Sequence, residues 1–382
     1  MRTVPREGSC GSPRRLRVVA AFALLRLIAG AGSLAAQSVQ GRVVSAPADA
    51  PVAGALVVLV DSAGSDAVRT ASTASGGFML TAPRPGLYRI AVRQIGMQTW
   101  QSTPLRLAPG PSVPLVLRID AQPFELPAIN VEARRPRCGI RLDDDETVSR
   151  LLDVAQTALA LAQTTADEGA LSFAVEGYAA RYTPVLQQVD SVGTGVGRLS
   201  TWPIQSAPPD TLQVRGFVRT DAPGQGWADV GPNRGPVYYG LDARVLFSDW
   251  FLATHCFRLD DAAEDELRIR FTPGRGRRRT DVEGSLALDR ATLELRRIGF
   301  SYVGLPDWIP GGRAGGEIRL RRLPSGAWVP YAWRMRAPVP QLAAGRSRPR
   351  VDGWLETGGW VRSVRGPDGR IDSTLTRAVL GR

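Results

Sequence analysis

The stretch Ala55-Leu56-Val57-Val58-Leu59-Val60 is an uninterrupted apolar run as long as one β-strand. A strand with one face in water alternates apolar and polar side chains, so a run without polar residues predicts a strand that is covered on both faces. Residues typical of turns enclose the run, with Pro51-Val52-Ala53-Gly54 before it and Asp61-Ser62-Ala63-Gly64 after it. The run therefore predicts a buried strand within a β-domain.

Further short strands are predicted around this run. Residues 39–44 alternate apolar with polar or small side chains, and residues 113–119 place an apolar side chain at every second position. Tyr88, Ile90 and Val92 share one face of another strand. About seven short strands in some 80 residues, without a helical period, predict an antiparallel β-sandwich.

The order of motifs in this region resembles that of a known family. The motifs are Gly41-Arg42-Val43, then Pro51 to Val57, then Gly76-Gly77-Phe78 and Gly86-Leu87-Tyr88. Over residues 38–120 they resemble the carboxypeptidase regulatory-like domain, a transthyretin-like sandwich. The resemblance implies a non-catalytic accessory module, often placed at the start of surface receptors and carbohydrate-active proteins. The likeness to carbohydrate-binding-like folds is an analogy of fold and does not establish sugar binding.

Residues 1–36 have the organisation of a secretory signal peptide. Arg14, Arg15 and Arg17 form a positive segment, an apolar stretch follows at 18–28, and small residues fill 30–36. Cleavage is predicted near residues 35–37. We therefore expect an exported protein of the periplasm or the outer membrane, with peripheral membrane association as one possibility.

The formal net charge of +12 does not predict a nucleic-acid partner. All 48 basic residues are arginine, and residues 1–36 hold six of them and one glutamate, so removal of this segment lowers the charge to +7. The other arginines are spread along strands beside acidic residues. The one dense run, residues 274–279, predicts a solvated hairpin tip, and contact with an anionic lipid or nucleic acid is the alternative.

A linker and a helix follow the sandwich. Residues 121–142 contain three prolines and predict an extended linker. Residues 126–134 resemble the segment that follows this module in TonB-dependent receptors, but the remaining 250 or so residues are too few for a plug and a barrel of about 22 strands. A helix is predicted at residues 143–164, because acidic residues fill its first turn and its apolar residues form one stripe. The stripe consists of Val148, Leu151, Leu152, Ala155, Leu159 and Ala162.

Residues 165–375 predict a second, β-rich domain, which makes the whole chain mainly β. Alternating segments recur without helices, and they predict a curved antiparallel meander or half-barrel. The predicted strands are 171–182, 212–219, 267–271, 282–288, 293–302, 318–323, 328–335 and 351–361. A hairpin is predicted at Gly193-Thr194-Gly195-Val196-Gly197, and a short helix or cap at residues 238–256.

The pattern of residues 284–298 resembles the curved half-barrels of bacterial lipoprotein-carrier proteins. This resemblance implies a concave apolar face able to hold an acyl chain. Five tryptophans are candidate lining residues of that face, and packing within the sheet core is the other interpretation. They are Trp308, Trp328, Trp333, Trp354 and Trp360.

The sequence offers little support for catalysis. His255 is the only histidine, so a zinc site of the carboxypeptidase type has too few ligands. The nucleophile motif Gly-x-Ser-x-Gly of serine hydrolases is absent. We expect no enzymatic activity and no cofactor or metal. A pair of carboxylates that meets in space stays an open alternative, since glycoside hydrolysis needs only two acids.

The predicted function is that of a non-catalytic exported envelope protein, a binding or scaffold module. Its expected partner is an envelope protein, a lipid or a glycan. A glycan-active enzyme or carbohydrate-binding protein with an accessory sandwich is one alternative, and a lipid or lipoprotein carrier is another.

Two cysteines stay after cleavage of the signal peptide, Cys138 and Cys256. In an oxidising compartment two thiols far apart in sequence most simply form one disulfide. A free or metal-bound pair and an intermolecular bond are the alternatives.

Overall fold

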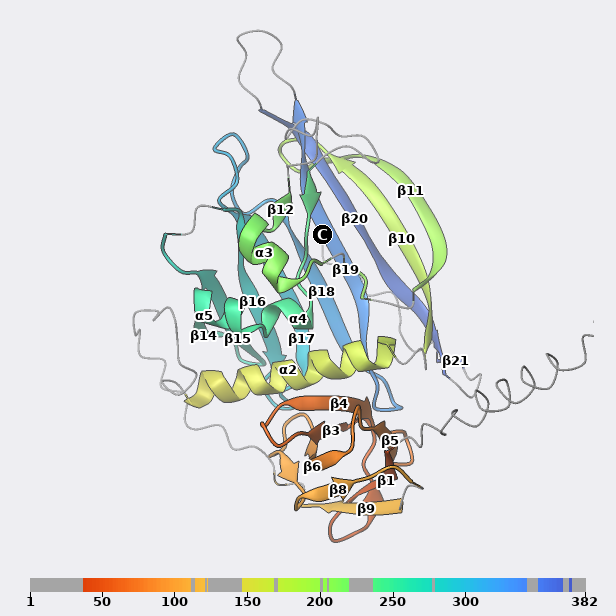
Figure 1. Ribbon diagram of the computed structural model, residues 1–382. Helices are drawn as coiled ribbons and strands as arrows, with labels where there is room; N and C mark the ends of the chain where they lie inside the picture. Colours follow the sequence, from red (N-terminus) through yellow and green to blue (C-terminus); the bar gives the residue numbers. More distant parts are fainter. Residues whose placement is uncertain are drawn as a thin grey trace, which may run out of the picture.

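The structure is a computed structural model that describes residues 37–110, 114–120, 122, 146–167, 171–199, 202–204, 206–219, 236–276, 279–341, 350–366 and 371–372. The predicted signal peptide and almost all of the predicted linker lie outside these residues. The described part is mainly β, as predicted, with a sandwich, a long helix and one large antiparallel sheet (Figure 1).

The first domain is a sandwich of two sheets. Strand β1 lies between β5 and β9 in one sheet, with β2 beside its end, and β4, β3, β6 and β7 form the other, with β8 beside β6. All described pairings in the sandwich are antiparallel except that of β1 with β9, which is parallel. The strands are β1 (Ser38–Ser45), β2 (Ala50–Pro51), β3 (Leu56–Val60), β4 (Asp66–Ala71), β5 (Gly77–Thr81), β6 (Gly86–Arg93), β7 (Trp100–Gln101), β8 (Leu105–Leu107) and β9 (Pro114–Ile119).

Strand β3 is buried on both faces, as its apolar run predicts. Val57 and Leu59 point into the sandwich core, between the two sheets. Leu56 and Val58 point the other way and belong to a second core that contains the long helix and the large sheet. The sandwich is therefore packed against the rest of the chain through its central strand.

Helix α2 (Glu146–Asp167) lies between the sandwich and the large sheet (Figure 1). It contacts β3 and β4 on one side and β14, β15, β17 and β19 on the other. Its buried residues extend beyond the predicted stripe and include Val154, Ala160 and Leu161. A helix covered by β-structure on two sides needs apolar side chains around most of its circumference, which explains the wider face.

The large sheet has ten described strands and is an antiparallel meander. Its order is β11-β10-β20-β19-β18-β17-β16-β15-β14, with β21 beside β20. Among the described strands β11 and β14 each pair on one side only, so the sheet is open. Its strands are β10 (Ser172–Tyr182), β11 (Gln188–Leu199), β14 (His255–Ala263), β15 (Glu266–Pro273), β16 (Asp281–Asp289), β17 (Leu295–Val303), β18 (Gly315–Arg322), β19 (Trp328–Gln341), β20 (Arg350–Arg365) and β21 (Ile371–Asp372).

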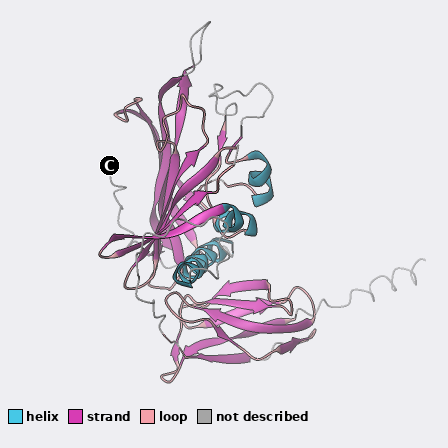
Figure 2. Cartoon of the chain, turned by 90° about the vertical axis from the view of Figure 1, so that its left-hand side faces the viewer, coloured by secondary structure: helices cyan, strands magenta, loops and turns pink. Residues whose placement is uncertain are grey.

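The helices pack on one face of this sheet, which we call the inner face (Figure 2). On β15 the side chains of Leu267, Ile269 and Phe271 point toward the helices and belong to the main core. The alternate residues Glu266 and Arg268 therefore point to the opposite, outer face. The shorter elements are α3 (Pro209–Arg215), β12 (Val218–Arg219), β13 (Val237–Tyr238), α4 (Ala243–Leu246) and α5 (Asp249–Thr254).

One local prediction for this domain is wrong. Residues 212–219 were expected as one strand, but the first half of them, 212–215, lies in α3 and only Val218–Arg219 form a strand, β12. Pro209 occupies the first turn, where a missing N–H costs nothing, and Gly216 ends the helix with a φ of 78°. The glycines at 193–197 do belong to a hairpin, as part of one arm: they lie in β11, which pairs antiparallel with β10, and the turn between the two strands is at residues 183–187.

Within the described part of the chain, no helix combines the length and the apolar composition that crossing a membrane requires.

The sandwich and the large sheet also touch backbone to backbone at two glycines. Gly54 and Gly326 both have positive φ angles, 67° and 88°. A Cβ built on Gly54 would lie 2.1 Å from the carbonyl oxygen of Gly326, and one on Gly326 would lie 2.7 Å from the Gly54 nitrogen. Any side chain at either position would push the two domains apart.

We therefore expect Gly54→Ala to destabilise the protein more than Gly64→Ala does. Gly64 has a φ of 83° and no atom within 4 Å of a built Cβ, so its substitution adds backbone strain alone, about 1–2 kcal/mol. Gly54→Ala adds the same strain and the clash with Gly326, which costs about 1–3 kcal/mol more. Urea unfolding of the full chain measures both. Equal losses in the two variants would contradict this account of the contact.

Candidate ligand-binding site

An apolar pocket of about 310 Å³ lies on the inner face of the large sheet, where β19 and β20 meet the segment 203–204 and β13. We call it the inner pocket. Most of its lining is aliphatic or aromatic, and no charged residue takes part. The lining residues are Pro203, Ile204, Tyr238, Trp333, Met335, Ala337, Leu355, Thr357 and Gly358.

Strand pairing fixes which side chains face the inner pocket. Trp333 pairs directly with Ile318, and Ile318 is buried in the main core. Residues paired across an antiparallel sheet share a face, so Trp333 faces inward, as do Met335 and Ala337 at the next alternate positions. Thr357 pairs with Met335 on the neighbouring strand and continues the same wall.

Tyr238 brings a buried hydroxyl to this pocket. Its side-chain oxygen has no hydrogen-bond partner among the described residues. Its ring meets that of Tyr302 edge to face, with centroids 5.4 Å apart, and the Tyr302 hydroxyl donates to the Tyr239 carbonyl at 2.8 Å. An unpaired buried hydroxyl is costly, and Tyr238 and Thr357 are the two lining residues of the inner pocket that carry a hydroxyl group.

Two adjacent glycines of β20 receive aromatic rings on opposite faces. A Cβ on Gly359 would lie 2.7 Å from Cζ2 of Trp333, and one on Gly358 would lie 2.8 Å from Cε1 of Tyr178. The Trp333 ring thus lies over Gly359 on the inner face, and the Tyr178 ring lies over Gly358 on the outer face. The absence of side chains at these two glycines allows the two rings to lie against β20, and the Trp333 ring forms one wall of the inner pocket.

Glu356 anchors a polar cluster on the outer face, behind the inner pocket. This buried carboxylate accepts a hydrogen bond from the Tyr178 hydroxyl at 3.0 Å and from Arg336 Nε at 3.0 Å. Tyr182 lies at 3.4 Å from the same carboxylate, and Arg336 sits over the Tyr182 ring at 5.4 Å. These partners account for the burial of Glu356 and hold β10, β19 and β20 together.

A second buried carboxylate, Glu317, lies on the same face. It pairs with Arg319 at 2.7 Å and with Arg334 at 3.5 Å, and Arg297 at 3.9 Å links it to Glu266. The hydrogen bonds and ion pairs described for Glu317 and Glu356 are all with arginine or tyrosine side chains of the sheet. The arrangement therefore explains their burial as cross-strand pairing of the outer face.

His255 is packed away from solvent. Its ring lies flat against that of Phe251, with centroids 3.6 Å apart, and its Nδ1 is 3.0 Å from the Phe251 carbonyl oxygen. A carbonyl only accepts, so Nδ1 carries a hydrogen, and Nε2 lies 3.3 Å from Asp281. Both side chains are almost fully buried, which places the pair in the attachment of α5 to the sheet.

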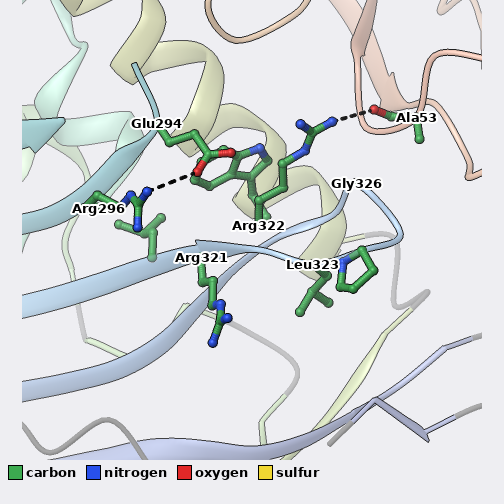
Figure 3. Close-up of a pocket in the computed structure, with 10 residues that line it drawn as sticks. Ala53, Glu294, Arg296, Arg321, Arg322, Leu323 and Gly326 are labelled. Carbon is green, nitrogen blue, oxygen red and sulfur yellow. Dashed lines mark hydrogen bonds and ion pairs between the residues drawn. The ribbon is translucent and has the colours of Figure 1, made fainter. Parts of the chain in front are cut away.

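A second cavity, of about 560 Å³, lies between the sandwich and the large sheet (Figure 3). Arg322 donates to the Ala53 carbonyl at 3.1 Å across this interface. Arg296 pairs with Asp289 at 2.9 Å and lies 3.8 Å from Glu294. Because these guanidinium groups already have protein partners, the cavity is better explained as part of the domain interface than as a ligand site.

The structure does not bring the five candidate tryptophans onto one concave surface. Trp333 alone lines the inner pocket. Trp328 is buried and lines the domain interface, whereas Trp354 is buried and donates from Nε1 to the Pro184 carbonyl at 3.3 Å. Trp308 packs against the main core from the loop before β18, and Trp360 meets Tyr178 at 6.1 Å on the outer face. Trp308, Trp328 and Trp354 thus agree with the core interpretation, and Trp360 lies on the outer face.

Sequence reasoning missed most of the inner pocket. Neither Tyr238 nor Met335 was predicted as a site residue, because a single tyrosine or methionine in an alternating strand is an ordinary core residue. The alternation of Trp333, Met335 and Ala337 was the pattern that could have identified the wall, since all three fall on one face of a strand.

The predicted disulfide joins a buried residue to one outside the described part of the chain. Cys256 lies in β14 and is 3% exposed. Cys138 is outside the described residues, so the pairing stays a prediction. Among the described residues, no group of three or more histidine, cysteine, aspartate or glutamate side chains is placed to hold a metal ion.

Comparison with known families identifies the sandwich. Residues 38–120 match the family model of the carboxypeptidase regulatory-like domain, which confirms the resemblance carried by its turn and strand motifs. That domain is non-catalytic in itself. No curated protein matches the chain. The match covers the sandwich and not the ten-stranded sheet, whose likeness to lipoprotein-carrier proteins stays a prediction.

The tyrosines around the site predict a loss of stability at alkaline pH. Burial raises the pKa of Tyr178, Tyr182, Tyr238 and Tyr302, and the Glu356 charge adds to the effect at the first two. The folded protein keeps protons that the unfolded chain releases above pH ~10, so the free energy of unfolding falls as the pH rises past that value.

Tyrosinate absorbance and circular dichroism, recorded together from pH 8 to 13, measure this effect. We expect the absorbance of these four tyrosines to appear only as the structure is lost. Complete ionisation of all tyrosines while the native dichroism persists would show that they are not buried as described.

Proposed function

We propose that this chain is a non-catalytic binding protein of the cell envelope, and that it holds an apolar ligand in the inner pocket. The observation that carries the proposal is the inner pocket itself, about 310 Å³ with the walls of Trp333, Met335 and Leu355. Pockets of about this volume with mainly apolar walls are typical of sites for small apolar ligands.

The lining of the inner pocket favours binding over catalysis. Its hydroxyl groups are those of Thr357 and Tyr238, and the lining has no histidine, cysteine or carboxylate that would activate a hydroxyl as nucleophile. The buried carboxylates Glu317 and Glu356 lie on the other face of the sheet, among arginines. A glycan-active enzyme is therefore the weaker candidate, since it needs two acids on one cleft.

The sandwich supports the same proposal in a different way. Its match to the carboxypeptidase regulatory-like domain indicates an accessory module, and its packing on α2 fixes it beneath the large sheet. An exported location follows from the predicted signal peptide at residues 1–36.

Substitution of Thr357 by tryptophan tests the proposed function. Thr357 is exposed and lines the inner pocket, so an indole there occupies the ligand volume without displacing a core residue. We expect Thr357→Trp to weaken binding of the fluorescent hydrophobe 1-aminoanthracene at least about tenfold, or 1.4 kcal/mol.

Val196→Trp is the matched control. Val196 is an exposed strand residue on the outer face, since it pairs with Glu176, and Glu176 pairs with Trp360. We expect this variant to bind as the parent chain does. An unmodified chain that fails to bind the probe, or two variants with the same affinity, would refute the proposed function.

A further inference from the structure

A row of glycines crosses the inner face beside the inner pocket. Trp333 on β19 pairs with Gly359 on β20, Gly359 pairs with Gly177 on β10, and Gly177 pairs with Gly195 on β11. Paired positions share a face, so all three glycines lie on the same side of the sheet as Trp333.

Within the part of the chain that the structure describes, a neighbouring side chain explains only one of these glycines. The Trp333 ring occupies the space of a side chain at Gly359. At Gly177 the nearest described atom to a built Cβ is the Gly358 carbonyl oxygen at 3.6 Å, which is ordinary contact, and at Gly195 no atom of the described residues lies within 4 Å. Neither has a φ in the left-handed region, so the backbone does not require glycine at either position.

Glycine in a strand interior costs about 0.5–1 kcal/mol relative to alanine. A glycine without a steric or conformational need within the chain is typical of places where a ligand approaches the backbone closely. The space above Gly177 and Gly195 is the kind of room such a ligand would use.

The glycines continue the floor of the inner pocket. Thr357 and Gly358, which line the inner pocket, lie on β20 beside Gly359. The next strand adds Ala179, which pairs with Thr357. The inner face therefore carries only small side chains from the pocket wall across β10 to the edge strand β11, at Gly177, Ala179 and Gly195. We call these three residues the glycine strip.

We propose that the ligand is a linear aliphatic chain, which leaves the inner pocket beside Trp333 and crosses β10 and β11 on the glycine strip. This inference rests on the proposed function and goes further, because a compact hydrophobe would need the inner pocket alone. Strands lie about 4.8 Å apart, so two strands beyond β20 lengthen the site by about 10 Å. A flat floor of that length suits an extended acyl chain of a fatty acid or a lipid.

The experiment fills the strip with side chains and leaves the inner pocket as it is. The double variant Gly177→Val and Gly195→Val places two isopropyl groups in the open space of the strip, where strand geometry tolerates valine. Gly299→Val is the control. Gly299 also lies in a strand with no atom near a built Cβ, but it alternates with the inward-facing Ile298 and Phe300 and so points to the outer face.

Two fluorescent probes are titrated into the unmodified chain and each variant. Parinaric acid is a linear fatty acid, and 1-aminoanthracene is compact. We expect the double variant to bind parinaric acid at least about tenfold more weakly and 1-aminoanthracene within about twofold of the parent. Gly299→Val should bind both as the parent does.

A phosphatidylcholine with a parinaroyl chain, offered in vesicles, distinguishes a lipid from a free fatty acid as the source of the aliphatic chain. Transfer from the vesicles would show that the bound aliphatic chain belongs to a lipid. Binding of the free acid alone would show that the ligand is a fatty acid.

If the double variant binds parinaric acid as the parent does, and Thr357→Trp binds neither probe, the proposed role of the glycine strip is wrong and the proposed function stands. If the double variant loses both probes equally and melts at a lower temperature than Gly299→Val, the glycines serve the curvature of the sheet. The proposed role of the glycine strip in binding is then also wrong. If the unmodified chain binds neither probe, both proposals are wrong.

Discussion

The packing of helix α2 between two β-layers is the constraint on which the rest of the structure depends. On the sandwich side it buries Leu56 and Val58 of β3, and on the other side it covers the inner face of the large sheet. Each buried side chain of this size contributes about 1.5–3 kcal/mol relative to exposure. Because β3 also carries Val57 and Leu59 in the sandwich core, one strand joins the two cores. The Gly54–Gly326 contact is a second place where the two domains pack directly against each other.

This packing also decides where a ligand can bind. Helices α2, α3, α4 and α5 lie over the part of the inner face formed by β14 to β19 (Figure 1). The wing formed by β20, β10 and β11 carries Gly177, Ala179 and Gly195 in its middle and the buried Val175 and Val361 beside them, and the inner pocket lies at the boundary between the two parts. On the outer face of the same wing, the contacts of Glu356 with Tyr178 and Arg336 tie three strands together. A rigid outer face, with an inner face that is open at Gly177 and Gly195 beside the buried Val175 and Val361, suits the wing to hold a ligand without rearrangement.

Much of the fold could be predicted from residue patterns, and less of the site. The run at residues 55–60 predicted a strand covered on both faces, and alternation predicted most strands of the large sheet. The strand prediction for residues 212–219 was wrong, because a seven-residue helix that begins at a proline is too short for its pattern to be distinguished from that of a strand. The hairpin predicted at 193–197 is present, but the sequence shows only that glycine is there and not whether a neighbour fills the space beside it. The inner pocket depends on pairings such as Trp333 with Gly359, which join residues from separate strands and cannot be derived without the register.

Native mass spectrometry of the protein, isolated from its own cells without detergent, tests the central claim most directly. The account predicts a discrete added mass that corresponds to a molecule with an aliphatic chain, present in the native spectrum and lost when the protein is denatured. A bare chain in every preparation, with no added mass after incubation with a total lipid extract, would contradict the assignment of the inner face as a ligand-binding surface.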